Sequence, residues 1–501
     1  MRIEYITTPI YYVNDVPHIG HAYTTVAADV LSRYHRLRGC DTFFLTGTDE
    51  HGRKVEQAAV SAGVRPIELA DGVVERFMQL WAALDIRYDD FIRTTEKRHG
   101  IAVAELVGRV YEAGDIYLGQ YEDWYCVPCE TFLTESQLVD GKCPDCGRPT
   151  EKLKEASYFF NLPKYEQPLL KYIDEHPDFI MPKSRRNEVV SFIEGGLKPL
   201  SISRTAFKWG IPMPMDPAHV VYVWMDALTN YLTGIGWPQD EGRFNRYWPH
   251  VTHLIGKDIL RFHAVYWPAF LMAAGMEPPL RIFAHGWWTN KGEKMSKSRG
   301  NFVDPLPLIE RYGSDALRFF LFREVTFGLD GDFSETALVK RINNELADNF
   351  GNLLQRVLKM IGRYRQGRIP EPTGNLLEAM AICRKSVLER VHNAMTDLAL
   401  HKALYHTGVF ISETNGLVES SAPWKLAKDP AADGKLDDVL YELAERLRFI
   451  TVLMAPFTPA ACSRAWAQLG IKEPMEERDI GKPIEHGTVI GKPEILFKKF
   501  D

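Results

Sequence analysis

Long apolar runs are missing from this sequence, and so is an excess of basic charge. No stretch reaches the roughly 18 consecutive apolar residues that indicate a membrane helix, so we expect no membrane span. The N-terminal segment lacks the apolar core and the small-residue cleavage site of an export signal, which favours a cytoplasmic protein. Sixty basic residues against 66 acidic ones leave a formal charge of −6. Any contact with nucleic acid must therefore come from a local basic patch.

Cysteine is also scarce, and its spacing argues against a disulfide framework. Four of the seven cysteines fall within one 21-residue window, whereas Cys40, Cys383 and Cys462 are scattered. The window holds two Cys-x-x-Cys pairs separated by 13 residues, which predicts a tetrahedral Zn²⁺ site in a reducing compartment. Since protein thiolates would fill all four positions, we expect the metal to stabilise its domain rather than to catalyse. The four predicted ligands are Cys126, Cys129, Cys143 and Cys146.

The chain is long enough, at 501 residues, for two to four domains. Short apolar runs at Ile3–Thr8 and Asp41–Thr46 alternate with helical spacing at His21–Leu37 and Pro66–Leu84. Strand and helix in alternation are typical of a parallel, doubly wound sheet. A turn-rich stretch around the cysteine window then interrupts this pattern.

The alternation resumes after the interruption, with strand-like runs at Val220–Val223, His253–Ile255 and Arg281–Ala284. Long helical periodicity then dominates, as at Val339–Tyr364, Leu376–Leu398 and Leu436–Met454. The chain is therefore predicted to be an α/β Rossmann-type domain split by a zinc-knuckle insertion and followed by an all-α helical bundle. The expected boundaries are 1–112 and 213–284 for the split domain, 113–212 for the insertion, 285–335 for a linker, and 336–501 for the bundle with a short extended tail.

One polar motif, His18-Ile19-Gly20-His21, directly follows the first strand and opens a helix. Free backbone N–H groups and the positive end of the helix dipole suit an anion at such a place. Two imidazoles on one helix face could donate hydrogen bonds to phosphate, and Gly20 would let a flat ring approach the backbone. A pair of surface histidines, or half of a metal site, is the alternative interpretation of this motif alone.

A second motif, Lys294-Met295-Ser296-Lys297-Ser298, lies between Gly292 and Gly300. Two lysines and two hydroxyls in a loop flanked by glycines suit the binding of a polyphosphate, whose developing negative charge the lysines would stabilise. By itself, so short a motif would more often be a solvated basic turn.

Together the two motifs resemble the paired signatures of the class I aminoacyl-tRNA synthetases. We call His18–His21 the first signature and Lys294–Ser298 the second. The resemblance implies ATP binding by His18, Gly20, His21, Lys294, Met295, Ser296, Lys297 and Ser298. It implies catalysis by His18, His21, Lys294 and Lys297, which would position the substrates and stabilise charge, with Mg²⁺ accompanying ATP.

Further segments resemble motifs of the methionyl-tRNA synthetase family, and the resemblance extends from residue 3 to about 470. The segments are Thr7–Tyr12, Gly47–Gly52, Val223–Tyr231, Gly256–His263 and Ser420–Lys425. This family activates methionine with ATP and transfers it to tRNA(Met), for initiation and elongation of translation. The resemblance implies a methionine site made of Ile10, Tyr12, Asp49, Trp224, Tyr231, Asp258, Phe262, His263 and Trp267.

The composition of this methionine site suits a thioether, which is polarizable and makes favourable contacts with aromatic rings. A thioether sulfur accepts hydrogen bonds only weakly, so one or two donors such as Tyr231 or His263 would mark its position. The resemblance assigns the substrate ammonium to Asp49, and a supporting role to Asp258 and Arg204. Pro9 departs from the Ala-Leu of some relatives and could reshape the pocket floor.

The helical part contains a basic segment between residues 352 and 368, which has five basic residues and no acidic one. Such a run is more often an ordinary solvated face. The resemblance nevertheless implies that Asn352, Arg356 and Trp424 read the anticodon of tRNA(Met), because stacking and side-chain hydrogen bonds are how proteins read unpaired bases.

Two other functions were weighed against this one. A nucleotidyltransferase of the same superfamily shares the first signature but lacks a long helical domain. A non-catalytic RNA-binding module would not need intact lysines and histidines in both signatures. We further expect a monomer, since the chain ends soon after the helical domain, without the β-barrel that dimerises some relatives.

Overall fold

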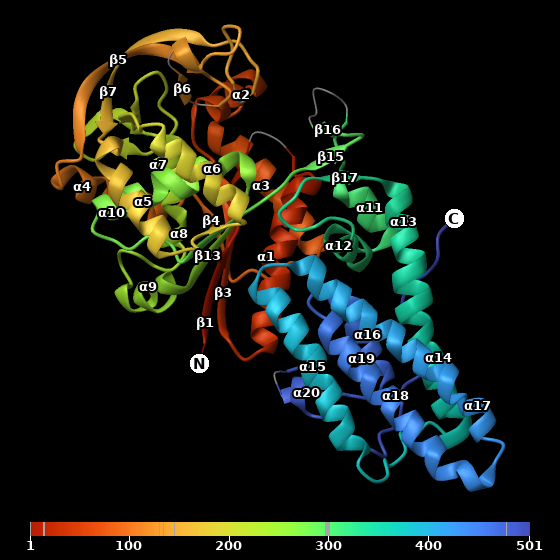
Figure 1. Ribbon diagram of the computed structural model, residues 1–501. Helices are drawn as coiled ribbons and strands as arrows, with labels where there is room; N and C mark the ends of the chain where they lie inside the picture. Colours follow the sequence, from red (N-terminus) through yellow and green to blue (C-terminus); the bar gives the residue numbers. More distant parts are fainter. Residues whose placement is uncertain are drawn as a thin grey trace.

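A parallel sheet lies at the centre of the α/β part in the computed structural model, which describes residues 2–13, 16–129, 131–133, 135–144, 146–295, 301–476 and 478–501 (Figure 1). The strand β1 (Ile3–Thr7) lies between β3 (Asp41–Asp49) and β13 (Val251–Gly256), and all three run in the same direction. The short β2 continues β1 along β3. The other members of the sheet are β2 (Tyr11–Tyr12), β4 (Asp90–Arg93), β14 (Arg281–His285) and β8 (Ile180–Met181).

Helices connect these strands, as the alternation of strand and helix predicts. Trp81 of α3 and Phe44 of β3 belong to the same buried cluster as α1, so these helices pack on the sheet through continuous apolar contacts. The helices of the first half are α1 (Ile19–Leu37), α2 (Arg53–Ala62), α3 (Pro66–Ala83) and α4 (Lys97–Glu112). Those of the second half are α7 (Val223–Leu228), α8 (Asn230–Thr233), α9 (Glu241–Tyr247) and α10 (Trp267–Ala273).

The predicted insertion builds two antiparallel sheets together with β12, which lies beyond its expected end at residue 212: one sheet is β6-β5-β7-β9 and the other is β10-β12-β11. Its strand β8 joins the edge of the central sheet, so this segment also extends the α/β core. The elements are β5 (Ile116–Cys126), β6 (Thr131–Leu133), β7 (Glu151–Phe160), α5 (Glu166–Glu175), α6 (Lys183–Glu194), β9 (Leu200–Ser201), β10 (Ser203–Arg204), β11 (Pro212–Met213) and β12 (Asp216–Val221).

One predicted strand is partly wrong. The run Val220–Val223 was expected to be a strand beside the resumed α/β pattern, but β12 ends at Val221 and pairs only within the small sheet. Val223 instead begins α7. A short apolar run is compatible with either a strand or a buried helix start, and here the aromatic and polar residues that follow pack as a helix.

A further three-stranded sheet, β16-β15-β17, connects the α/β part to the helical part. Its central strand β15 pairs with β16 on one side and with β17 on the other. The elements of this region are β15 (Trp288–Asn290), β16 (Glu293–Lys294), α11 (Pro305–Tyr312), α12 (Ser314–Arg323) and β17 (Gly331–Phe333).

Helices make up most of the described chain from residue 335 to 481 and form an elongated bundle beside α1, whereas residues 482–501 contain no helix (Figure 1). The predicted helix Val339–Tyr364 is not one α-helix, because a π-helical segment, Ile342–Gly351, separates its two parts. The helices are α13 (Glu335–Arg341), α14 (Asn352–Arg365), α15 (Leu376–Thr396), α16 (Leu400–Ser421), α17 (Pro423–Leu426), α18 (Asp433–Met454), α19 (Pro459–Gln468) and α20 (Arg478–Gly481). None of the helices within the described ranges is both long and apolar enough to span a membrane.

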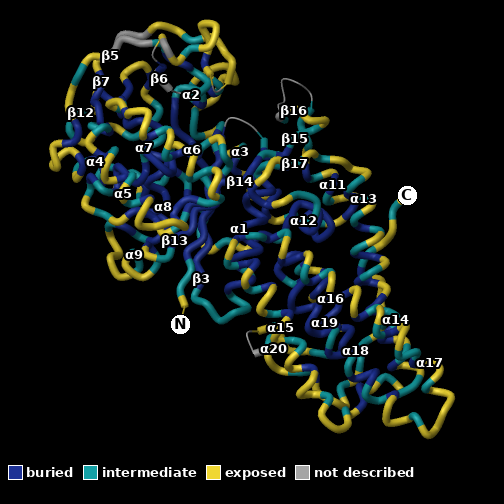
Figure 2. Tube along the Cα trace, viewed as in Figure 1, coloured by how far each residue is buried: buried dark blue, intermediate teal, exposed yellow. Residues whose placement is uncertain are grey.

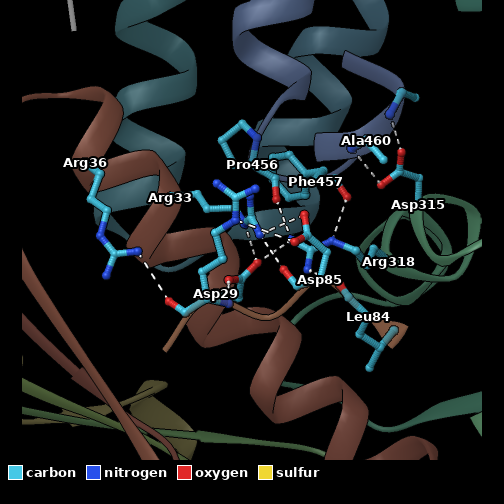
Figure 3. A network of polar contacts seen from close by, with 12 residues as sticks. Asp29, Arg33, Arg36, Leu84, Asp85, Asp315, Arg318, Pro456, Phe457 and Ala460 are labelled. Carbon is cyan, nitrogen blue, oxygen red and sulfur yellow. Dashed lines mark hydrogen bonds and ion pairs between the residues drawn. The ribbon is translucent and has the colours of Figure 1, made fainter. Parts of the chain in front are cut away.

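The bundle and α1 share one continuous core, which Figure 2 shows as buried trace along α1, α16, α18 and α19. Within this core lies a fully buried ion pair between Asp29 of α1 and Arg318 of α12, at 2.6 Å (Figure 3). Arg318 also donates to the backbone carbonyls of Leu84, Pro456 and Phe457. One side chain therefore joins α1, the end of α3 and the corner between α18 and α19.

Candidate active site

The predicted site residues gather where the order of strands in the central sheet reverses direction. From β1 the chain proceeds through β3 and β4 on one side, and later through β13 and β14 on the other. Ligands of open parallel sheets bind at the carboxyl ends of the strands at such a switch point. Ile10 and Tyr12 follow the end of β1, whereas Asp258 and Phe262 follow the end of β13. The fold thus brings both predicted groups to one crevice.

The first signature forms the N-terminus of α1. His18 is the N-cap residue, and its Nδ1 accepts the backbone N–H of Gly20 at 3.0 Å. The Nδ1 of His21 accepts the backbone N–H of His18, also at 3.0 Å. Because each Nδ1 accepts, the proton of a neutral ring resides on Nε2, which becomes a donor. Burial lowers the pKa of His21 well below its usual range, and the neighbouring His18 adds to this shift, so that ring stays neutral.

Two expectations about this signature need correction. The N–H groups of Ile19 and Gly20 are not free for an anion, because they donate to the Val303 carbonyl and to the His18 ring. His18 caps α1, and its ring centroid lies 3.8 Å from that of His21, so the two imidazoles do lie on the same side of the helix start. In addition, the ring closest to Gly20 belongs to His18: a Cβ at position 20 would lie 2.7 Å from its Cε1. If this motif binds phosphate, the donors are therefore chiefly the imidazole groups.

The second signature begins at the hairpin of β15 and β16, where Lys294 pairs with Thr289. Ser296, Lys297 and Ser298 lie outside the described residues, as does the side chain of Lys294. Met295 is half-buried and packs against the large core cluster. The chain that follows returns to the first signature: the Phe302 ring lies 5.8 Å from the His18 ring, and the Val303 carbonyl accepts from Ile19 at 3.2 Å.

Aromatic side chains from α7, α8 and the segment after β13 meet beside the crevice. The rings of Trp224 and Phe262 stack with centroids 3.8 Å apart and 6° between their planes. The Tyr231 hydroxyl lies 2.8 Å from Nε2 of His263. Trp267 is fully buried and lies behind Tyr231, at 6.2 Å between ring centroids. Ile10 and Tyr12 are half-buried and pack against this same cluster.

The hydrogen bonds of Tyr231 and His263 determine which group donates. Nδ1 of His263 lies 2.9 Å from the Ile259 carbonyl and must carry the ring proton. Burial lowers the pKa of His263 to about 4, so its Nε2 is an acceptor at neutral pH. The Tyr231 hydroxyl therefore donates to His263, and a thioether sulfur would have to share that proton or displace the bond.

The polar residues predicted for the methionine site are spread around it. Asp49 ends β3 as a buried residue, in register with Tyr12. Asp258 is exposed and accepts from the Trp287 indole at 3.1 Å. Arg204 is buried at the edge of the insertion, where it donates to the Ser201 and Ser203 carbonyls. The guanidinium of Arg204 also lies 4.8 Å from the ring centroid of Tyr222, the N-cap of α7, so Arg204 links the insertion to the helix that carries Trp224.

Three buried residues near this site received no role from the sequence. Asp226 accepts from His51 at 2.7 Å and from His99 at 2.8 Å. His51 and Asp226 both lie within motifs that resemble the methionyl-tRNA synthetase family, two residues after Asp49 and Trp224 respectively. The presence of titratable residues inside these motifs could have indicated a role for His51 and Asp226. Their contact with each other could not be predicted, because they are far apart in the sequence.

The cysteine window folds into one compact cluster. The Sγ atoms of Cys126 and Cys146 are 3.5 Å apart, those of Cys129 and Cys143 are 3.8 Å apart, and all four lie within 4.8 Å of one another. Tetrahedral zinc with bonds of about 2.3 Å would separate its sulfur ligands by about 3.8 Å, so the cluster fits this ion. Burial raises the pKa of the Cys126 thiol to about 12, which a bound cation would reverse.

The residues predicted to read RNA lie on α14 and α17 of the helical part. Asn352 is exposed at the start of α14, and Trp424 is 37% exposed in α17. Arg356 forms an ion pair of 2.5 Å with Glu419 of α16. The charge of Arg356 is therefore already compensated, and a nucleic acid would have to displace Glu419 to use it.

The fold and the site define a class of protein, which a family model supports directly. The model described as tRNA synthetases class I (M) matches residues 4–153 and 147–358. The protein is thus a class I aminoacyl-tRNA synthetase. The family is also evident from curated relatives: the methionine–tRNA ligase of Caldanaerobacter subterraneus subsp. tengcongensis is 50% identical, over 99% of this chain and 79% of the relative. The corresponding ligase of Rickettsia conorii is 48% identical, over 99% of both chains.

Solved structures agree with these relatives. The Mycobacterium tuberculosis methionyl-tRNA synthetase in complex with methionyl-adenylate superposes with a TM-score of 0.96 at 46% identity, and covers 100% of both chains. Its ligand-free form superposes with a TM-score of 0.90 at 42% identity, covering 100% of this chain and 99% of that one. The chain belongs to the methionine–tRNA ligase family.

Proposed function

We propose that this methionine–tRNA ligase has three sites, one for activation, one for structural zinc and one for the anticodon, each assigned to particular residues. The crevice of the α/β part, residues 1–112 and 213–284, activates methionine with ATP. The insertion, residues 113–212, carries zinc, and residues 285–335 hold the second signature. The helical part, residues 336–501, reads the anticodon of tRNA(Met). The convergence of the two signatures carries this proposal, because the chain just after the second signature bonds to the first residue of α1.

In the first step, the methionine carboxylate attacks the α-phosphate of ATP, giving methionyl-adenylate and pyrophosphate. His18 and His21 direct their Nε2–H donors at the phosphates, and Lys294 and Lys297 stabilise the charge that develops on the leaving pyrophosphate. Mg²⁺ bound with ATP would supply further charge neutralisation. Gly20, Met295, Ser296 and Ser298 complete the ATP site. In the second step, the terminal ribose hydroxyl of tRNA attacks the aminoacyl carbonyl of methionyl-adenylate, which forms the ester bond and releases AMP.

Methionine recognition follows from the aromatic cluster. Trp224, Phe262, Tyr231 and Trp267 surround a thioether with polarizable rings, and Asp49 attracts the substrate ammonium. Ile10, Tyr12, His263 and Asp258 complete the site. Methionine-dependent exchange of pyrophosphate into ATP, measured with all twenty amino acids, tests the proposal. We expect exchange with methionine alone at low substrate concentration, and comparable exchange with another amino acid would overturn the assignment.

Zinc in the insertion leads to a prediction about metal content. We expect one zinc per chain in gently purified protein, since four thiolates at this spacing match its geometry. The variant Cys143→Ser should lose the zinc and loosen the insertion. As a control, Cys383→Ser should keep it, because Cys383 lies in the helical bundle. Elemental analysis measures both, and metal-free wild-type protein would refute the assignment.

The helical part leads to a prediction about charging. Losing one stack between a base and an aromatic ring costs about 1–3 kcal/mol, or about 5- to 150-fold in binding. Trp424→Ala should therefore reduce tRNA charging by this factor, while methionine-dependent pyrophosphate exchange stays near normal. Trp424→Phe, which keeps a ring, should retain more of the charging activity. An equal loss of both reactions in Trp424→Ala would instead mean that Trp424 supports the fold.

A further inference from the structure

A buried charge network lies directly behind the two sides of the methionine site. Asp226 is completely buried, and each of its carboxylate oxygens meets a different imidazole. Oδ2 lies 2.7 Å from Nδ1 of His51, and Oδ1 lies 2.8 Å from Nε2 of His99. The second nitrogen of His99 lies 3.1 Å from the Thr233 hydroxyl. These residues come from α7, α4, α8 and the segment after β3.

The network connects two groups that the proposed function places on the substrate. His51 follows Asp49, the ammonium ligand, by two residues. Asp226 follows Trp224, the aromatic wall, by two residues in the same short helix. The contact between His51 and Asp226 spans 175 residues of sequence, so it fixes one side of the site relative to the other.

The surroundings of His51 favour its charged form. Burial alone would lower the pKa of His51, but attraction to Asp226 and to Glu50 outweighs burial and raises it above 6.5. Burial alone would raise the pKa of Asp226, but His51 and His99 lower it to about 2. A charge-assisted hydrogen bond is roughly twice as strong as a neutral one.

Other groups hold the backbone around His51 in place. The neighbouring Glu50 is buried and accepts from Arg93, at 2.6 and 3.0 Å, while Arg93 also pairs with Asp71. Trp209 contacts the His51 ring at 5.5 Å between centroids and donates to the Glu50 carbonyl. The ion pair between His51 and Asp226 therefore joins the segment after β3, which these groups hold in place, to α7.

We propose that His51 is a positioning residue for methionine, which holds Asp49 and Trp224 at their working separation through its ion pair with Asp226. This inference rests on the proposed function, in which those two residues bind the substrate. A displacement of about 1 Å at a reacting or binding group can cost on the order of 100-fold. Loss of the pair should therefore weaken methionine binding without changing how ATP is bound.

Pyrophosphate exchange on the full-length His51→Gln variant tests this role. We expect the KM for methionine to rise by about 10- to 100-fold, while the KM for ATP stays within about threefold of wild type. Asp226→Asn, which keeps the shape but removes the charge, should show the same selective rise. His176→Gln, at the exposed histidine that caps the C-terminus of α5, is the matched control and should leave both constants unchanged.

The pH dependence gives a second measurement. The pKa of His51 is raised, so the charged contact is present at low pH and is lost as the pH rises through a value above 6.5. The KM for methionine of the wild type should increase across that range, and the His51→Gln variant should lack this increase. Equal rises in both KM values, or unchanged kinetics with only a lower melting temperature, would overturn the inference. A wild type without methionine-dependent exchange would instead overturn the proposed function.

Discussion

The variant His21→Asn should form methionyl-adenylate about 100- to 1,000-fold more slowly than the wild type, the usual cost of removing one donor to a developing negative charge. Asparagine can place its side-chain oxygen where Nδ1 of His21 accepts the His18 N–H, so the start of α1 is preserved. Asparagine is too short to place a donor at the position of Nε2. The KM for methionine should change little, because this donor contacts phosphate and not the amino acid.

The matched variant His21→Gln separates the two roles of His21, which are donating a hydrogen bond to phosphate and accepting the His18 N–H at the start of α1. Glutamine reaches the Nε2 position with an amide donor, but it offers no acceptor in place of Nδ1. It should keep more of the rate of adenylate formation than His21→Asn, although its thermal stability should be lower. Single-turnover formation of adenylate measures the rate directly. If His21→Asn formed adenylate at the wild-type rate, the imidazole would serve only the helix N-terminus.

The second large effect is expected at the buried ion pair of Figure 3. Arg318→Met should lower the free energy of unfolding by about 3–5 kcal/mol, because Asp29 loses one of its two cationic partners and three buried backbone carbonyls lose their donor, at about 1–3 kcal/mol for each unsatisfied group. Asp29 would keep Arg33 and the backbone N–H of Arg87. The carbonyls of Pro456 and Phe457 would lose their donor, which loosens the corner between α18 and α19. Urea unfolding monitored by tryptophan fluorescence measures the change.

The control for this variant is a nearby pair that water reaches. Arg36 and Asp89 pair at 2.5 Å, but their side chains are 33% and 37% exposed. Arg36→Met should therefore cost less than about 1 kcal/mol. Comparable losses in the two variants would show that burial of the Arg318 pair adds nothing to stability.

Sequence patterns predicted the larger elements well because those elements are strongly periodic. Helix α1 was expected from His21 and begins at Ile19. The difference arises because histidine, rather than serine, threonine, aspartate or asparagine, forms the N-cap. Strand β3 was expected to end at Thr46 but continues to Asp49, since its polar end is buried beside β2 and β4. The cysteine cluster was predicted fully, because close spacing determines its geometry.

Contacts between distant segments could not be predicted in this way. The bond between Asp226 and His99 spans 127 residues, and that between Arg356 and Glu419 spans 63. No local pattern marks these partners, since pairing depends on where the fold brings each helix. The same limit explains why free N–H groups were expected at α1. One of them donates to the carbonyl of Val303, which lies far away in the sequence, between residues 285 and 335.

The position of β1 in the sheet has a consequence for synthesis on the ribosome. One of its two neighbours, β3, follows soon after it, but the other, β13, contributes partners such as His253 that lie 246 residues later. At about 5–20 residues per second, translation needs about 12 to 50 s to cover that distance. Throughout this interval the nascent chain presents one edge of an apolar strand, with its N–H and C=O groups, to whatever is nearby. Chaperones that cover exposed strand edges would act on this enzyme before its catalytic crevice exists.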